Sequence, residues 1–283
     1  MKINLAKSAG LCFGVKRALK IVKETAKSNK EIYLLGDIVH NEKLIKEICS
    51  LGIKKIKRLG KGKGRILIIR AHGCSKDTDK KARQSGYKII DATCPMVKEI
   101  HQIAKRWQNK GYRIIIIGDK KHDEVQGIKG QLNNKAMIID NINNIPLAKI
   151  QRIKKSAVVL QSTQNIEKVT QIIEVLKKYI GELKFFNTVC RPTRLKQEEI
   201  KMLPLENDLM LIVGSKISAN TKRLYEISQL LNKKSYWINS ENEIKAAWLK
   251  KVKTVGVAAG ASTPDSTIQE IITRLKDLDS KKQ

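Results

Sequence analysis

The chain has 283 residues, of which 41% are hydrophobic and 30% are charged, and its formal net charge is +30. This length and composition exclude a disordered chain and suffice for one large α/β domain or for two or three small ones. The charge has three candidate origins: compositional drift toward lysine, an anionic ligand or acidic protein partner, and nucleic acid. Nucleic acid is disfavoured, because the lysines are spread along the whole chain and aromatic residues make up only 4%.

The N-terminal segment is not typical of a secretory signal, because Asn4 and Lys7 interrupt its apolar stretch. No run of about 18 apolar residues predicts a membrane span. We therefore expect a cytoplasmic protein without a membrane segment. The five cysteines are odd in number and contain no C-x-x-C pair, which disfavours a disulfide framework and a zinc ribbon.

Two cysteines lie near the first predicted helices of the chain. Cys12 lies in a turn flanked by glycines, which leads into a predicted helix over 15–26. Cys49 stands beside Ile45 and Ile48, so we predict that Cys49 is a small core residue.

Five segments repeat one pattern, in which an apolar run is followed by a polar loop and a helix-like stretch. They are 65–84, 112–127, 157–179, 208–231 and 254–275. Short runs rich in Ile and Val before amphipathic stretches are typical of strand–helix units in parallel sheets. Ligands bind beyond the carboxyl ends of such strands, where each loop leads into the electropositive start of a helix. The polar loop residues are either simple helix caps or, as five similar loops favour, ligands of one phosphate-like anion.

Two further cysteines precede predicted helices. Cys94 stands before Pro95, which suits the first helical position, and Cys190 lies in a loop before another helix. Together with Cys12, they give each third of the chain one such cysteine. Thiols at helix N-termini are readily thiolates. The three are therefore either independent buried or reactive residues or the ligands of one iron–sulfur cluster. Cys74, which follows an Ala-His-Gly loop, is expected to be a bystander.

Seven motifs occur in the order found in one enzyme family. They are GLCFGV (10–15), VHN (39–41), AHG (71–73), DATCP (91–95), HDEVQG (122–127), GSKISAN (214–220) and GASTPD (260–265). In these motifs, the chain resembles the 4-hydroxy-3-methylbut-2-enyl diphosphate reductase family, which performs the last step of the methylerythritol phosphate route to isoprenoids. The resemblance covers nearly the whole chain.

The resemblance implies an α/β fold with three similar units, each with a small and mostly parallel sheet, around a pseudo-threefold axis and a central cluster. We expect these units at residues 1–94, 95–190 and 191–283.

The resemblance also implies a cofactor and a reaction. Cys12, Cys94 and Cys190 would hold one four-iron four-sulfur (4Fe-4S) cluster with one open iron. Two electrons and two protons would remove the allylic hydroxyl of the substrate as water, giving isopentenyl diphosphate and dimethylallyl diphosphate.

The site residues that the resemblance implies have two roles. Glu124, which would otherwise be interpreted as an ordinary exposed glutamate, is the proton donor, and Ser162 and Thr163 are a hydroxyl pair near the substrate alcohol. His101 matches no family motif and is expected to be structural. The residues expected to bind the diphosphate are His40, His72, His122, Ser218, Ala219, Asn220 and Ser262.

This sequence departs from the family pattern at four positions. Asp123 stands where the family usually has proline, and we expect a looser loop around Glu124. Ser162 replaces a frequent threonine, Pro192 replaces a small residue, and Ala219 replaces a serine. The lost hydroxyl at Ala219 would cost roughly 1.5–3 kcal/mol of diphosphate binding, so we expect weaker affinity and an active enzyme.

The basic chain would suit a small acidic electron donor, such as ferredoxin or flavodoxin with its NADPH-dependent reductase. Two other functions stay open. One is a non-catalytic iron–sulfur redox sensor on the same scaffold, against which the presence of Glu124 argues. The other is a basic nucleic-acid-binding protein.

Overall fold

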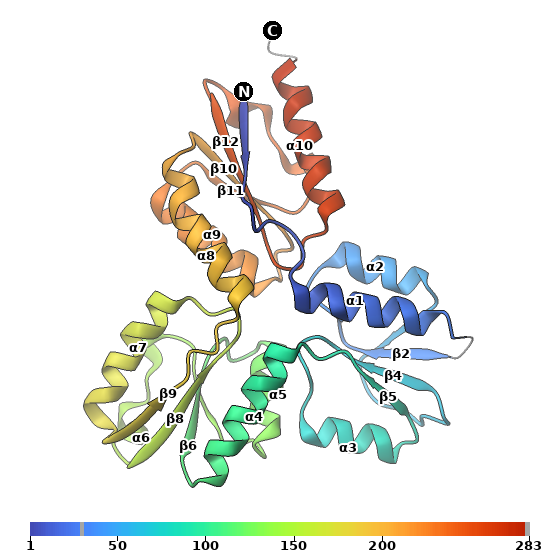
Figure 1. Cartoon of the computed structure of the whole chain (residues 1–283), viewed down its shortest axis with the longest axis vertical. Helices are drawn as coiled ribbons and strands as arrows, with labels where there is room; N and C mark the ends of the chain where they lie inside the picture. The colour runs from blue at the N-terminus through green and yellow to red at the C-terminus, as the bar shows by residue number, and fades with distance from the viewer. Residues whose placement is uncertain (29–30, 281–283) are drawn as a thin grey trace. The chain divides into compact units, whose positions relative to one another are not determined.

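The computed structural model describes residues 1–28 and 31–280, and within them the strands form three four-stranded sheets (Figure 1). The paired strands of these sheets run parallel. The chain divides into two compact units. The first unit consists of Met1–Lys16, His40–Lys46 and Arg191–Gln283, and the second consists of Arg17–Val39 and Glu47–Cys190.

The first unit contains the sheet with strand order β1-β12-β10-β11. Its strands are β1 (Lys2–Leu5), β10 (Leu209–Val213), β11 (Ser235–Ile238) and β12 (Thr254–Ala259). Its helices are α8 (Arg191–Met202), α9 (Ala219–Leu231) and α10 (Asp265–Ser280), with short 3-10 helices at Leu203–Leu205, Glu241–Glu243 and Ala246–Leu249. The first strand of the chain therefore pairs with the last, and Lys2 lies opposite Thr254.

Strand β10 shows how an apolar run forms the centre of a sheet. Successive side chains of a strand point to opposite faces. Leu211 packs in one core cluster with Ile271 of α10, whereas Ile212 packs in another with Ile200 of α8 and Leu224 of α9. The sheet is thus covered by α10 on one face and by α8 and α9 on the other (Figure 1).

The second unit contains two sheets, with strand orders β3-β2-β4-β5 and β7-β6-β8-β9. The strands of the former are β2 (Ile32–Leu35), β3 (Lys54–Ile56), β4 (Ile66–Ile69) and β5 (Lys88–Asp91). The strands of the latter are β6 (Arg113–Ile117), β7 (Met137–Ile139), β8 (Lys155–Leu160) and β9 (Glu182–Phe185). The helices of this unit are α3 (Lys76–Gln84), α4 (Pro95–Asn109), α5 (Asp123–Gln131), α6 (Leu147–Ile150) and α7 (Ile166–Tyr179), with a 3-10 helix at Ile142–Asn144.

Helices α1 (Phe13–Ala26) and α2 (Glu42–Ser50) each contain residues of both units. Within the described ranges, no helix is both long and apolar enough to cross a membrane.

Strand β6 repeats the alternation of β10. Ile115 packs in a core cluster with Ile172 of α7, whereas Ile116 packs with Ile100 of α4 and Ile128 of α5. Helices therefore cover both faces of this sheet, which explains why its central strands are apolar throughout rather than alternating.

The prediction of an α/β fold with small parallel sheets is confirmed. Each of the five repeated segments forms a strand followed by a helix, namely β4–α3, β6–α5, β8–α7, β10–α9 and β12–α10. The division at residues 94 and 190 stays a prediction.

One prediction about the core is wrong. Cys49 is exposed, although it lies beside Ile48, which is 1% exposed. The buried side of α2 passes through Leu44 and Ile48, and neighbouring residues in a helix point about 100° apart. Cys49 therefore points away from the buried stripe.

Candidate active site

Glu124 and Ser162 form a hydrogen-bonded pair, although they follow different strands of one sheet. Glu124 lies in the first turn of α5, after β6, and Ser162 follows β8. The backbone N–H of Ser162 donates to Oε1 of Glu124 at 2.6 Å, and the Ser162 hydroxyl donates to Oε2 at 2.7 Å. Glu124 is only 2% exposed. Glu124 is therefore a buried carboxyl group that two donors hold in place, not an ordinary exposed glutamate.

Gln161 connects the neighbouring loop to the second predicted hydroxyl. Its Oε1 accepts from the backbone N–H of Asp119 at 2.8 Å, and its Nε2 donates to Oγ1 of Thr163 at 3.1 Å. From the sequence, Gln161 is only one of the polar loop residues that could cap a helix or bind an anion, and it has no role of its own. The only signal was a glutamine directly after an apolar strand, and this residue is completely buried.

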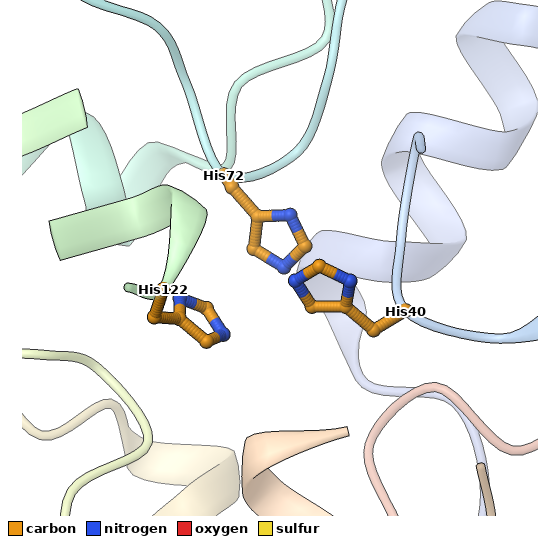
Figure 2. Close-up of side chains that lie close together, drawn as sticks. All are labelled: His40, His72 and His122. Atoms are coloured by element: carbon orange, nitrogen blue, oxygen red, sulfur yellow. The ribbon is translucent and has the colours of Figure 1, made fainter. Parts of the chain in front are cut away.

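His72 and His122 lie side by side, after β4 and β6 respectively (Figure 2). Their ring centroids are 5.3 Å apart and the rings are nearly perpendicular, at 88°. His122 is the N-cap of α5, and its Nδ1 accepts from the backbone N–H of Glu124 at 3.1 Å. When Nδ1 accepts, the proton of the neutral ring lies on Nε2, so Nε2 can donate to an anion.

Asp123, where we expect a looser loop, is the first residue of α5. Its Oδ2 lies 2.5 Å from NH1 of Arg70. The position that the family usually fills with proline is therefore fixed by an ion pair, which the sequence analysis did not predict.

Cys94 and Cys190 are both held through the backbone by loops of the second unit. The N–H of Cys94 donates to the carbonyl of Ala71 at 2.9 Å, and the N–H of Cys190 donates to the carbonyl of Ser162 at 3.0 Å. Cys94 is the N-cap of α4, and Pro95 is the first helical residue. Both cysteines are half-buried. The prediction that Pro95 starts a helix after Cys94 is confirmed.

Cys12 is the corresponding cysteine of the first unit. It directly precedes α1 and is half-buried. Its N–H donates to the carbonyl of Ala261 at 3.0 Å, in the loop between β12 and α10. The Cys12 loop is therefore fixed to the loop that carries Ser262.

The start of α9 contains a buried amide, that of Asn220. Ser218 is the N-cap, and its Oγ accepts from the N–H of Thr221 at 3.3 Å. Asn220 is 4% exposed, and neither polar atom of its side chain has a hydrogen-bond partner among the described residues. Leaving a buried polar group unsatisfied costs about 1–3 kcal/mol, so this helix N-terminus indicates a place for a polar or anionic ligand. Ala219, the position of the missing hydroxyl, is half-buried beside it.

The segment with His40 is tied to two loops of the same unit. The hydroxyl of Ser262 donates to the backbone carbonyl of His40 at 3.1 Å, and the hydroxyl of Ser215 donates to Oε1 of Glu42 at 2.9 Å. Ser215 follows β10 and Ser262 follows β12. The bonds therefore place His40 beside the carboxyl ends of these strands, as expected for a ligand-binding residue.

Lys196 of α8 is a buried cation that the sequence analysis missed. It is 4% exposed, and its Nζ donates to the carbonyls of Gly10 and Ala259, each at 3.1 Å, and to that of Ser8. These carbonyls flank the Cys12 loop and the end of β12. Nothing in the sequence distinguished this lysine from the many others, because its acceptors are backbone atoms of distant segments.

Cys74 and His101 lie near the site, and burial shifts the pKa of each. Burial, and then the negative charges of Asp79 and Asp91, raise the pKa of Cys74 to about 11. Burial, and then the positive charge of Lys105, lower the pKa of His101 to about 4. At neutral pH, the thiol is therefore protonated and the imidazole is neutral.

The predicted site residues thus fall into two groups, one in each unit. The first unit contains Cys12, His40, Ser218, Ala219, Asn220 and Ser262. The second contains His72, Cys94, His122, Glu124, Ser162, Thr163 and Cys190.

The sequence matches a family model described as LytB protein over residues 3–276. A protein of Aquifex aeolicus is 38% identical over 281 residues, which covers 98% of this chain and 96% of that protein. A protein of Caldanaerobacter subterraneus subsp. tengcongensis is 40% identical over 286 residues, which covers 98% of each. Both relatives are named 4-hydroxy-3-methylbut-2-enyl diphosphate reductase.

Two solved structures have the same fold. One is of (E)-4-hydroxy-3-methyl-but-2-enyl diphosphate reductase, the terminal enzyme of the non-mevalonate pathway, with a TM-score of 0.72, 36% identity and coverage of 98% of this chain and 100% of that one. The other, the E-1-hydroxy-2-methyl-but-2-enyl-4-diphosphate reductase from Plasmodium falciparum, has a TM-score of 0.90, 30% identity and coverage of 97% and 88%. Agreement in sequence and fold over nearly the whole chain shows that it belongs to the LytB family, whose members compared above are 4-hydroxy-3-methylbut-2-enyl diphosphate reductases, as its motifs predicted.

Proposed function

We propose that the chain reduces 4-hydroxy-3-methylbut-2-enyl diphosphate to isopentenyl diphosphate and dimethylallyl diphosphate, consuming two electrons and two protons and releasing water. The observation that carries the proposal is the buried pair of Glu124 and Ser162, in a chain whose relatives are named for this reductase. A carboxyl group held against a hydroxyl is an arrangement that suits general acid catalysis.

Cys12, Cys94 and Cys190 would hold the 4Fe-4S cluster. Each directly precedes a helix, where the free backbone N–H groups favour the thiolate form that iron binds. The donor set therefore fits the group. The cluster, when bound, supplies the electrons and a Lewis-acidic iron for loss of the hydroxyl.

The diphosphate would be bound by donors from the polar loops. Nε2 of His122 donates in the neutral ring, as the bond to its Nδ1 requires, and His72 lies against it. Asn220, whose amide has no partner among the described residues, would bind the anion at the start of α9. His40, Ser218 and Ser262 complete the proposed set, with Ala219 contributing only its backbone.

The proton would come from Glu124. In its protonated form, Glu124 would donate from Oε2 to the oxygen of Ser162, reversing the direction of the bond that joins them. The Ser162 hydroxyl would pass its own proton to the departing hydroxyl and take up the one from Glu124, while the backbone N–H at Oε1 keeps the carboxyl group in place. Thr163, oriented by Gln161, would act as the second hydroxyl. Binding energy from the diphosphate would hold the allylic carbon near these groups.

The electron donor would be a small acidic ferredoxin or flavodoxin, with its NADPH-dependent reductase, because the net charge of +30 attracts an acidic partner. Location in the cytoplasm is part of the same proposal.

The test is a Glu124→Gln variant, purified anaerobically, beside a Glu174→Gln control at an exposed position of α7. We expect the Glu124 variant to keep its cluster absorption and to lose at least about a hundredfold in kcat, while the control matches the unchanged chain. Full turnover in the Glu124 variant would remove Glu124 from the mechanism. A protein that reconstitutes a cluster but never reduces the substrate would instead favour the redox sensor. Absence of iron after careful reconstitution would contradict both.

A further inference from the structure

Arg70 and Asp123 join the two loops that carry His72 and His122. Arg70 follows β4 and stands two residues before His72, while Asp123 lies between His122 and Glu124. NH1 of Arg70 and Oδ2 of Asp123 are 2.5 Å apart. The pair therefore links the end of β4 to the first turn of α5. Strand β4 and strand β6, which precedes α5, belong to the two different sheets of the second unit.

Two glycines let the backbone come close to this pair and to the His72 loop. A Cβ on Gly36 would lie 2.7 Å from NH1 of Arg70, so a side chain there would push against the guanidinium. Farther along α5, a Cβ on Gly127 would lie 3.3 Å from the carbonyl oxygen of His72. The helix thus approaches the His72 loop at backbone distance, and the ion pair is the polar contact at its start.

The pair is partly shielded from water. The side chains of Arg70 and Asp123 are 21% and 32% exposed, and both line a cavity of about 290 Å³. Ion pairs on an open surface contribute little, whereas partly desolvated pairs with good geometry fix their partners more strongly. Because Arg70 and Asp123 are close in sequence to His72 and His122, the ion pair restrains the two histidine loops more strongly than an ion pair on an open surface would.

We propose that Arg70 and Asp123 are positioning residues, which hold His72 and His122 at the separation needed to bind a diphosphate. This inference rests on the proposed function for its ligand. Where the family pattern uses the fixed backbone of proline before the glutamate, this chain uses a charge pair that reaches across to the other loop. Neither side chain needs to touch the substrate.

The test compares Arg70→Gln, Asp123→Asn, the double variant and the conservative Arg70→Lys in the cluster-loaded protein. The control is Arg83→Gln, which breaks an arginine–aspartate pair with Asp79 on the surface of α3. Steady-state kinetics would give KM and kcat separately, and calorimetry would give the affinity for inorganic diphosphate without any turnover.

We expect each single variant to raise KM and weaken diphosphate binding about tenfold, with a much smaller change in kcat. The double variant should be no worse than either single variant, because residues in one pair are not additive. Arg70→Lys should recover most of the affinity, and Arg83→Gln should change nothing. Unchanged KM in the single variants, or additive losses in the double variant, would overturn the inference.

A structural measurement separates this inference from the proposed function. In a crystal structure of the Asp123→Asn variant, the His72 and His122 rings should be farther apart than the 5.3 Å of the intact pair. An unchanged separation would overturn the positioning role, even if the enzyme is active. A widened separation, with weakened diphosphate binding, would support it even if the unchanged chain reduces no substrate.

Discussion

Lys196 and His101 are two buried basic side chains with different surroundings. The ammonium of Lys196 donates to three backbone carbonyls, which replace the water that it loses on burial. His101 is 8% exposed, and its Nε2 has no hydrogen-bond partner among the described residues. A charge there would be unpaired, so the ring stays neutral and packs near Gly73, whose added Cβ would lie 3.0 Å from its Cε1.

His101 should make the stability of the protein depend on pH. Its pKa is lowered to about 4 by burial, and then by Lys105, from an ordinary value of 6.5. Between these values, the unfolded chain binds a proton that the folded protein excludes. The contribution of His101 to the free energy of unfolding is thus present above pH 6.5 and is lost as the pH falls toward 4. From pH 7 to pH 5, this loss should be about 2 kcal/mol.

Denaturant unfolding of the unchanged chain and a His101→Gln variant at both pH values would measure this contribution. The variant should lose less stability on acidification than the unchanged chain. Equal losses would show that His101 is not the group that titrates.

Which residues of the site can be predicted depends on where their partners lie. Cys94 and Pro95 are adjacent, so the helix start at Cys94 follows from the local sequence. The partner of Glu124 is Ser162, 38 residues away, and their contact depends on β6 and β8 being neighbours in the sheet. The motifs identified both residues but could not show that they touch.

At the scale of elements, a glycine of α5 allows this helix to pack closely against the loop after β4. A Cβ on Gly130 would lie 2.2 Å from Cβ and 2.9 Å from Cα of Ser75, so the helix and the loop after β4 meet without an intervening side chain. Gly130 therefore sets the distance between the helix that carries Glu124 and the loop that carries His72.

A Gly130→Ala substitution should destabilise the protein by about 1–3 kcal/mol, despite the better helix propensity of alanine, because the methyl group overlaps Ser75. Denaturation midpoints would measure the change. Gly60→Ala is the matched control, since a Cβ there meets nothing within 4 Å. A Gly130→Ala protein that is as stable as the control would mean that the loop moves aside at no cost.

The strands and helices themselves follow mainly from periodicity. The run LMLIV predicts β10 and the pattern after it predicts α9, because burial on both faces leaves an unbroken apolar segment. Strand β1 has only four residues, KINL, with mixed exposure. No local pattern identifies such a strand, since its pairing with β12 supplies what its sequence lacks.

At the scale of the whole molecule, the net charge of +30 is unfavourable for folding. Like charges repel more strongly in the compact protein than in the extended chain. The described residues contain ion pairs, such as Lys43 with Glu270 and Lys23 with Glu47, but the acidic residues number fewer than half of the basic ones.

Added salt should therefore raise the Tm by a few degrees. Between about 20 mM and about 300 mM NaCl, the screening length falls to roughly a quarter, which weakens the repulsion throughout the protein. Scanning calorimetry with chloride and with acetate salts would measure the effect, and equal shifts would identify screening rather than binding of one anion. A Tm that stays constant or falls would show that the repulsion contributes little.

The pairing of β1 with β12 also bears on how the protein is made. Residues Lys2–Leu5 are synthesised long before their partners, Thr254–Val257. Cys12 is likewise made before Ala261, whose carbonyl accepts from its N–H. Ser8 and Gly10 are made before Lys196, whose Nζ donates to their carbonyls. Until β12 and the loop after it are synthesised, the N-terminal strand has no partner strand and the Cys12 loop is not fixed. Cys12 is thus translated before Cys49, Cys74, Cys94 and Cys190, although the strand and loop that fix it are made after all of them.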